Sequence, residues 1–259
     1  MTTLAAAIDA LEPVEDGGWR GAVPDNWLQG RTAYGGFSAA LALHAAKDAG
    51  GGLPPLRSAQ IAFVGPLSGA VLLRAQVLRR GRNVTFVGVD VEGEAGLGLR
   101  ATFVFMAARE SAMDHLAPPP PAPPVPDAAA DRLSAPPGVA FAGNFEMVRA
   151  ARNGEGGPAA WRRWARLADR DGLDPEVELL AVADVLPPAA LRLLGRPAPI
   201  SSITWQVDVT GAPATRDGWW LLGAESDHAR GGFSAQRMFI RDADGGAVAT
   251  QVQGVGIFA

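Results

Sequence analysis

The C-terminal stretch from Trp219 to Ala259 reads WWLLGAESDHARGGFSAQRMFIRDADGGAVATQVQGVGIFA. It predicts three consecutive antiparallel strands, over residues 219–228, 233–241 and 247–258. Glycine-rich turns at 231–232 and 244–246 separate them, because glycine supplies the positive φ of tight hairpins. Side chains alternate between the two faces of a strand, so Gln253 lies inside an otherwise apolar last strand. The remainder of the chain should pack against this sheet, and part of it should face the Gln253 side chain.

A similar pattern occurs once earlier, in residues 70–105, AVLLRAQVLRRGRNVTFVGVDVEGEAGLGLRATFVF. Both copies begin with two leucines, turn at a basic glycine corner, turn again at a charged glycine loop and end in aromatic residues. A further strand precedes each copy, over 57–64 and 201–209, and a helix precedes that strand, over 36–48 and 175–194. A helix followed by four strands, given twice, indicates an internal duplication.

Composition and charge exclude several classes of protein. The 259 residues are 48% hydrophobic and 19% charged, with a net charge of −4 and a pI of about 5.4, so no basic field favours nucleic acid. The chain has no cysteine, which excludes disulfides and thiolate metal sites and fits a cytoplasmic location. Neither a signal peptide nor an apolar run long enough to span a membrane is expected.

A proline-rich segment divides the chain. Residues 115–126 read HLAPPPPAPPVP, and alanine and proline continue to residue 138. This composition predicts a stiff, extended linker over 114–138, between domains at 1–113 and 139–259. A plain spacer is favoured over a ligand for a proline-recognising partner. In the first domain, the helix FSAALALHAAKD is apolar on nearly every face, which predicts an antiparallel sheet wrapped around a buried helix.

One carboxylate lies in an apolar helix of the second domain. Asp184 has Val182, Ala183, Val185 and Leu186 around it, and a carboxylate there is costly unless it is paired or functional. Two interpretations stay open: Asp184 caps a helix that restarts at the two prolines of 187–188, or it is a catalytic group. We expect the helix to bend at these prolines.

Two other polar residues have both structural and functional interpretations. Gln253 could simply bond a neighbour in the sheet, and Ser202, at the start of a strand, could bond only backbone. The three histidines, His44, His115 and His228, have no metal-ligand spacing, so the sequence predicts neither a metal site nor a cofactor.

Taken in order, several short segments resemble one family. They are Tyr34-Gly-Gly-Phe, Ser58-Ala-Gln-Ile-Ala-Phe-Val-Gly-Pro, Leu78-Arg-Arg-Gly-Arg, Ala181-Val-Ala-Asp, Ser202-Ile-Thr-Trp-Gln-Val and Gly246-Ala-Val-Ala-Thr-Gln-Val-Gln. Their order and spacing are similar to those of the double-hotdog acyl-CoA thioesterases of the bacterial thioesterase II type. The resemblance implies an α+β fold of two tandem hotdog domains, each an antiparallel sheet wrapped around a long helix.

The resemblance also implies an activity, hydrolysis of an acyl-CoA thioester to a free acid and coenzyme A. Asp184 would activate a water molecule, and Ser202 and Gln253 would hold that water and the aspartate. Acyl-CoA would be the partner, and the hotdog sheets could also support a homo-oligomer. The further residues implied or suggested for substrate binding are Ser201 as an alternative to Ser202, Tyr34, Gly35 and Gly36 at the helix start, and Arg82 and Arg230 for phosphates.

Two other functions stay open. A non-catalytic acyl-ligand binder would use the same fold and the same tunnel. A hotdog hydratase or dehydratase would normally show an aspartate and a histidine on the helix and its loop, and here the only helix histidine, His44, lies near the helix end.

Overall fold

The computed structural model describes residues 1–15, 17–117, 122–127, 129–150, 157–196 and 198–258. The α-helices of this part are α1 (Leu4–Asp9), α2 (Gly35–Gly50) and α3 (Pro175–Ala183). Its 3-10 helices are η1 (Asp25–Trp27), η2 (Ala140–Asn144), η3 (Ala189–Leu193) and η4 (Arg216–Gly218). The strands are β1 (Glu12–Pro13), β2 (Trp19–Val23), β3 (Leu28–Gln29), β4 (Thr32–Ala33), β5 (Leu56–Phe63), β6 (Gly69–Arg80), β7 (Val84–Gly93), β8 (Gly96–Met106), β9 (Phe145–Arg149), β10 (Ala160–Leu167), β11 (Ile200–Val209), β12 (Trp220–Arg230), β13 (Phe233–Arg241) and β14 (Ala247–Ile257).

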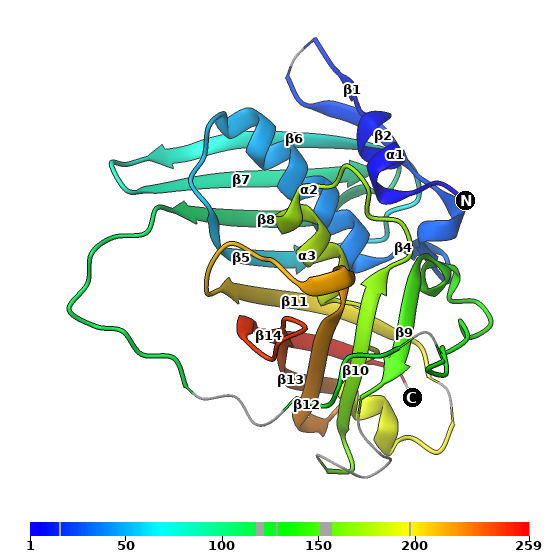
Figure 1. Ribbon diagram of the computed structural model, residues 1–259. Coiled ribbons are helices and arrows are strands. Elements are labelled where there is room, and N and C mark those ends of the chain that lie inside the picture. Colours follow the sequence, from blue (N-terminus) through cyan, green and yellow to red (C-terminus); the bar gives the residue numbers. More distant parts are fainter. Residues whose placement is uncertain (16, 118–121, 128, 151–156, 197, 259) are drawn as a thin grey trace.

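Twelve of these strands form one antiparallel sheet, in the order β1-β2-β6-β7-β8-β5-β11-β14-β13-β12-β10-β9 (Figure 1). The four strands from β5 to β8 lie in the order 5-8-7-6, and those from β11 to β14 in the corresponding order 11-14-13-12. β5 pairs with β11, with Gln60 opposite Gln206, so the two sets of four strands meet at the middle of the sheet. The predicted repeat of four strands is therefore confirmed in its topology.

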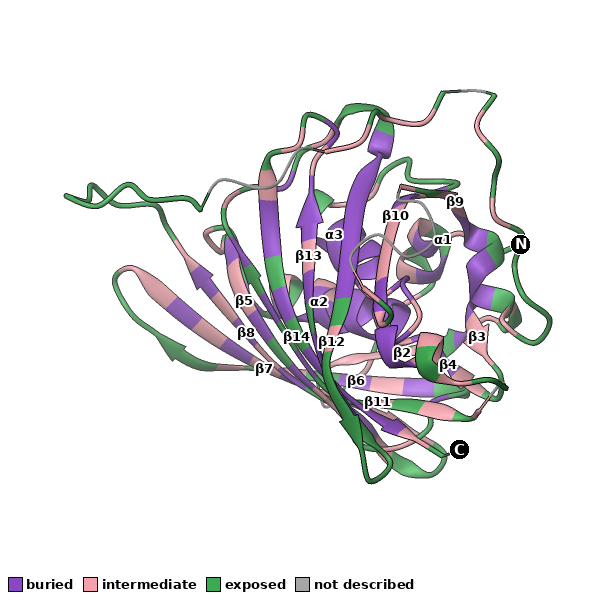
Figure 2. Cartoon of the chain, turned by 90° about the horizontal axis from the view of Figure 1, so that it is seen from below, coloured by how far each residue is buried: buried purple, intermediate pink, exposed green. Residues whose placement is uncertain are grey.

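The sheet curves around the helices (Figure 2). α2 packs against β6, β7, β8 and α3, and its small apolar side chains, such as Ala39, Ala42 and Leu43, are fully buried. A helix that is apolar all round has no face suited to water, so burial between sheet and second helix satisfies it. α1 begins as predicted, with the Thr3 hydroxyl accepting a hydrogen bond from the Ala6 N–H.

The prediction of one bent helix over 175–194 is wrong in its second part. α3 ends at Ala183, Asp184 is its C-cap, and a separate 3-10 helix, η3, follows from Ala189. Proline pushes the residue before it out of α geometry, and Pro187 and Pro188 follow each other, so the chain leaves the helix instead of bending within it. Asp184 does not cap the restart either, because the N-cap of η3 is Pro188.

The proline-rich linker is more than a spacer. Its residues 118–121 and 128 lie outside the described part of the chain, but its end packs on the protein. The Gly138 carbonyl accepts a hydrogen bond from the Gly30 N–H, and Pro136 and Pro137 form part of a cavity wall. The expectation of a spacer without another role is therefore wrong for the end of the linker.

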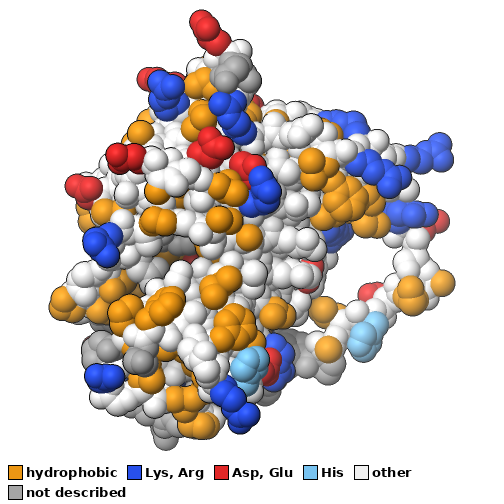
Figure 3. Space-filling view, turned by 180° about the vertical axis from the view of Figure 1, so that it is seen from behind, with side chains coloured by type: hydrophobic (Ala, Val, Ile, Leu, Met, Phe, Trp, Pro, Cys, Tyr) orange, Lys and Arg blue, Asp and Glu red, His pale blue; other side chains and the backbone are white. Residues whose placement is uncertain are grey.

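The outer face of the sheet carries several exposed hydrophobic side chains, part of the apolar surface visible in Figure 3. Ile203, Phe233 and Val252 are 41%, 39% and 56% exposed. A side-chain carbon added at Gly254 or Gly256 would collide with Phe233 or lie against Ile203, so glycine lets these side chains lie flat on the strand. No helix in the described residues is long and apolar enough to cross a membrane.

Candidate active site

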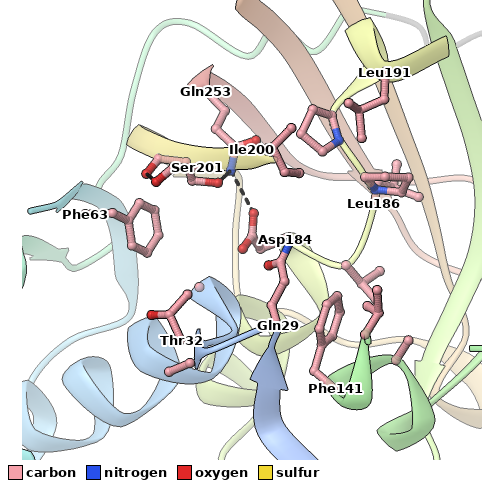
Figure 4. Close-up of a pocket in the computed structure, with 18 of the residues that line it drawn as sticks. Gln29, Thr32, Phe63, Phe141, Asp184, Leu186, Leu191, Ile200, Ser201 and Gln253 are labelled. Carbon is pink, nitrogen blue, oxygen red and sulfur yellow. Dashed lines mark hydrogen bonds between the residues drawn. The ribbon is translucent and has the colours of Figure 1, made fainter. Parts of the chain in front are cut away.

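Asp184 lies where α3 ends, between the sheet and the start of α2. Its carboxylate accepts a 2.7 Å hydrogen bond from Nε2 of Gln253 (Figure 4). It accepts another from the backbone N–H of Gly36. The rest of its surface faces a cavity, which explains why the side chain is only partly buried although protein surrounds it. The carboxylate is thus fixed on two sides and open on a third.

The position of Gln253 follows from strand alternation. It lies on the inner face of β14, 2% exposed, directly opposite Gln236 of β13. Nε2 of Gln236 donates a 2.7 Å hydrogen bond to Oε1 of Gln253, and Oε1 of Gln236 accepts from the Ala189 N–H at 2.8 Å. Because the oxygen of Gln253 is used in this way, its NH2 group must point to Asp184.

Gln236 was not among the residues expected at the site. Its signal in the sequence is the same alternation that singles out Gln253, a buried amide on the neighbouring strand of a hairpin. A polar network in the protein interior is stable only when each member is satisfied, and Gln236 satisfies the Gln253 oxygen.

Of the two serines at the start of β11, Ser202 and not Ser201 contacts Gln253. Nε2 of Gln253 lies 3.2 Å from Oγ of Ser202. Ser201 is exposed at the cavity wall, and its Oγ donates only to the Ser202 carbonyl, at 3.3 Å. The pairing of β11 with β14 is irregular between Ser202 and Thr204, and this irregularity lies beside Gln253. The structure therefore brings Asp184, Ser202 and Gln253 together around one amide group.

The start of α2 lies against the Asp184 carboxylate. A side-chain carbon at Gly35 would lie 2.5 Å from Oδ2 of Asp184, and one at Gly36 would lie 2.7 Å from the Ala181 carbonyl oxygen. Both positions need glycine for this close approach. Tyr34, the N-cap residue, is buried, and its hydroxyl donates a 2.9 Å hydrogen bond to the same Ala181 carbonyl. Tyr34 thus joins the two helices and does not face the cavity.

Burial sets the electrostatics of the site. It raises the pKa of Asp184 from 3.8 to about 7, although the hydrogen bonds from Gln253 and Gly36 act in the opposite direction. Burial, followed by the nearby Asp184 charge, raises the pKa of Tyr34 well above 10.0, so Tyr34 stays neutral. An aspartate whose pKa is close to neutral can accept and release a proton at ordinary pH.

A cavity of about 1140 Å³ opens beside the carboxylate. Asp184, Gly35, Ser202 and Gln253 line one part of it. Most of the remaining wall is apolar, and it includes Phe63, Leu67, Phe141, Met147, Leu186 and Leu191. An apolar cavity with a few convergent polar groups is the usual form of a small-molecule site.

The family profiles match both halves of the chain. The acyl-CoA thioesterase N-terminal domain matches residues 23–106, and the acyl-CoA thioesterase C-terminal domain matches residues 115–257. The chain belongs to the acyl-CoA thioesterase family. It is accordingly an enzyme, a hydrolase of acyl-CoA thioesters, and the predicted resemblance is confirmed.

Solved structures share the fold of this acyl-CoA thioesterase. A hot dog fold protein of unknown function from Alicyclobacillus acidocaldarius is 24% identical, with a TM-score of 0.86 over 99% of this chain and 98% of that one. The tesB protein of Mycobacterium avium subs paratuberculosis is 20% identical, with a TM-score of 0.80 over 99% and 98%. The acyl-CoA thioesterase II TesB2 of Mycobacterium marinum is 18% identical, with a TM-score of 0.75 over 98% and 96%. No curated protein matches the sequence.

Two of the predicted substrate-binding residues of the thioesterase lie away from the cavity. Arg82 is in the β6–β7 turn, two residues after Arg80, which donates a hydrogen bond to the Gly50 carbonyl at the far end of α2. With 16 residues, α2 is about 24 Å long, and Asp184 contacts its other end. Arg230 is exposed at the end of β12, three strands or about 14 Å from Ser201. Neither arginine lines the cavity.

Within the described residues of the thioesterase, no group of three or more histidine, aspartate or glutamate side chains could hold a metal ion. His44 is on α2, but it does not line the cavity. The polar groups gathered around the Asp184 carboxylate at the cavity are the Gln253 amide, the Ser202 hydroxyl and the backbone N–H of Gly36 in the first turn of α2.

Proposed function

We propose that this acyl-CoA thioesterase hydrolyses its substrate with a water molecule that Asp184 activates. The observation that carries the proposal is the position of the Gln253 amide, whose Nε2 bonds both Oδ1 of Asp184 and Oγ of Ser202. A water molecule beside the open side of the carboxylate would lie within reach of Ser202 and of the cavity. Asp184 would take a proton from this water as it attacks the thioester carbonyl.

The raised pKa of Asp184 supports this role. A general base works best when its pKa lies near the operating pH, because it is then both ionised and basic enough to accept a proton. With a pKa of about 7, roughly half of the Asp184 carboxylates are ionised at neutral pH. An ordinary exposed aspartate would be fully ionised but a much weaker base.

The first turn of α2 is suited to the other demand of the reaction. The attack on the carbonyl produces an oxyanion, and N–H groups at a helix N-terminus stabilise negative charge. Gly35 lines the cavity in this turn and has no side chain to block the approach. We place the oxyanion there, beside the N–H that Gly36 already directs at Asp184.

The hydratase alternative lacks its histidine, since none of the cavity-lining residues is a histidine. The remaining mechanistic question is whether Asp184 acts on water or attacks the thioester itself. A single turnover in ¹⁸O-labelled water separates the two. Our proposal expects the label in the released acid on the first turnover. Label in Asp184, with an unlabelled acid, would show that the carboxylate is the nucleophile.

We also propose that the chain consists of two hotdog units, at 1–113 and 139–259, with the linker 114–138 between them. The repeated strand order and the shared junction at β5 and β11 support this division. The exposed apolar outer face supports self-association through the sheet, which a mass measurement in solution would test. A cytoplasmic role in lipid metabolism is the setting that we propose for the reaction.

A further inference from the structure

One positively charged side chain lies on the otherwise apolar inner face of β10. Trp161, Ala165 and Leu167 of this strand pack in the main hydrophobic core, and Arg163 is in the same alternating row. Arg163 is half-buried and lines the cavity that contains Asp184. An arginine at an inward-facing position requires a reason, because desolvation of its charge is costly.

The neighbours of Arg163 increase the positive charge. Arg149 of β9 is directly opposite Arg163 in the sheet. The guanidinium groups of Arg163 and Arg192 both lie over the Trp161 ring, 4.6 and 4.9 Å from its centre. Burial, followed by the charges of Arg149 and Arg192, lowers the pKa of Arg163 to about 10. Like charges placed opposite each other destabilise a sheet, so this arrangement costs stability in the free protein.

The described residues provide no ion pair for this cluster. In the part of the chain that the structure describes, no carboxylate forms an ion pair with Arg149, Arg163 or Arg192. Arg166, three residues along the same strand, does have such a partner, with its Nη2 2.9 Å from Oε1 of Glu146. Among the described residues, the lack of an ion pair is therefore a property of this cluster and not of the whole strand.

The wall around the cation is apolar. Met147, on β9, pairs with Ala165, two residues along β10 from Arg163. Met147 lines the cavity together with Leu186 and Leu191. The Trp161 indole N–H lies 3.4 Å from the Pro188 carbonyl oxygen, so the ring packs against the segment that follows Asp184. Such a wall suits a hydrocarbon chain, and a hydrocarbon chain that ends at a guanidinium group should end in an anion.

We propose that the cavity accepts acyl-CoA esters whose acyl chain ends in a carboxylate, and that Arg163 binds this terminal carboxylate. Arg149 and Arg192 raise the positive potential at that point, and Trp161 holds the guanidinium groups in place. The inference rests on the proposed function, because it assumes that the acyl chain extends from Asp184 along this wall. The phosphates of coenzyme A are the competing anion, but an apolar wall does not suit a nucleotide.

The structure connects this cluster to the reacting group. Pro188, whose carbonyl meets Trp161, is bonded to Ala189, whose N–H donates to Gln236. Gln236 in turn orients Gln253 against Asp184. A substrate carboxylate bound to Arg163 would therefore stabilise the Pro188–Ala189 segment, and this segment helps to position Asp184.

The test compares thioesters of equal chain length with and without the terminal carboxylate, for example octanoyl-CoA and suberyl-CoA. The wild-type kcat/KM, measured by thiol release, should favour the dicarboxylic ester. In Arg163→Met the ratio should fall roughly 10- to 100-fold, since a charge-assisted hydrogen bond to a partly buried carboxylate is lost. Arg163→Lys should retain part of the preference. Arg162→Gln, on the same strand but facing the other side, is the matched control and should keep the wild-type ratio.

Different failures have different meanings. Hydrolysis of both esters by the wild type without a preference for suberyl-CoA overturns the proposal, whether or not Arg163→Met folds. An equal loss on both esters in Arg163→Met shows instead that the cation binds coenzyme A phosphates or supports the fold. If neither ester is hydrolysed, the proposed function fails. Calorimetry of ester binding to the wild-type protein then tests separately whether Arg163 binds the terminal carboxylate. Equal affinity for the two esters contradicts that role.

Discussion

Nε2 of Gln236 donates a 2.7 Å hydrogen bond to Oε1 of Gln253, and this bond decides which end of the Gln253 amide faces Asp184. Without it, the amide could turn and present its oxygen to the carboxylate, which would repel the ionised form of the base. Gln236 is therefore a positioning residue that acts through Gln253 and does not itself reach the cavity.

Replacement of Gln236 should expose this role. Gln236→Leu leaves the Ala189 N–H and the Gln253 oxygen without partners, so we expect a loss of roughly 2 kcal/mol in the free energy of unfolding. Misorientation of the site should lower kcat roughly 10- to 100-fold with little change in KM. Gln206→Leu, on the exposed face of β11, is the control. A folded Gln236→Leu variant with the wild-type kcat would refute the positioning role.

The pH dependence of the reaction should follow the pKa of Asp184. Only the ionised carboxylate can accept a proton, so kcat/KM should rise tenfold per pH unit below the pKa and level off above about pH 7. Loss of thioester absorbance, which works over a wide pH range, gives the profile. A rate that is constant between roughly pH 5 and pH 8 would mean that another group limits the reaction.

The same pKa predicts how stability changes with pH. In the unfolded chain Asp184 should have its ordinary pKa of 3.8, whereas in the folded protein the pKa is about 7. The unfolded state therefore loses its proton first as the pH rises, and the folded state becomes less stable between these two values. The two pKa values differ by about three, so the destabilisation above pH 7 is at most about 4 kcal/mol.

Asp184→Asn removes this effect. Its free energy of unfolding should approach that of the wild type near pH 4 and exceed it by roughly 2 to 4 kcal/mol at pH 8. Urea denaturation at the two pH values measures the difference, with Asp114→Asn, an exposed position, as the control. If the difference in the free energy of unfolding between Asp184→Asn and the wild type does not change with pH, burial does not raise the pKa of Asp184.

Gly35 provides a steric test of the site. A side-chain carbon there would lie 2.5 Å from Oδ2 of Asp184 and 3.0 Å from the Phe63 ring, so Gly35→Ala must displace the carboxylate or the helix start. We expect kcat to fall roughly 100-fold. Gly211→Ala, where no atom lies within 4 Å, should be harmless. Full activity in Gly35→Ala would mean that the exact place of this carboxylate does not matter.

The strands could be predicted because their signals are local. Alternation and glycine turns place β12, β13 and β14 within one or two residues of their observed bounds. The end of α3 could not be placed in the same way, since two prolines indicate a break but not whether the helix continues beyond them. Asp184 looked like an N-cap from its neighbours in sequence, and only the packing of α2 and β14 around it shows what its carboxylate contacts.

The resemblance pointed to Asp184, Ser202 and Gln253, but it did not point to Gln236 or Arg163. Both of these follow from alternation once the pairing of strands is known, because each is a polar side chain in an inward-facing row. Arg82 and Arg230 were suggested by charge alone, and charge does not say at which end of a sheet a residue lies. The packing of the end of the proline-rich linker could not be predicted either, since composition indicates an extended chain but not where it packs.

The most direct test of the account is the turnover of Asp184→Asn with an acyl-CoA that the wild type hydrolyses. Asparagine keeps the shape of the side chain and its hydrogen bond with Gln253, but it cannot accept a proton from water. Turnover should fall roughly 10²- to 10⁴-fold while the affinity for acyl-CoA changes little. A folded Asp184→Asn variant that releases thiol at the wild-type rate would contradict the assignment of Asp184 as the base.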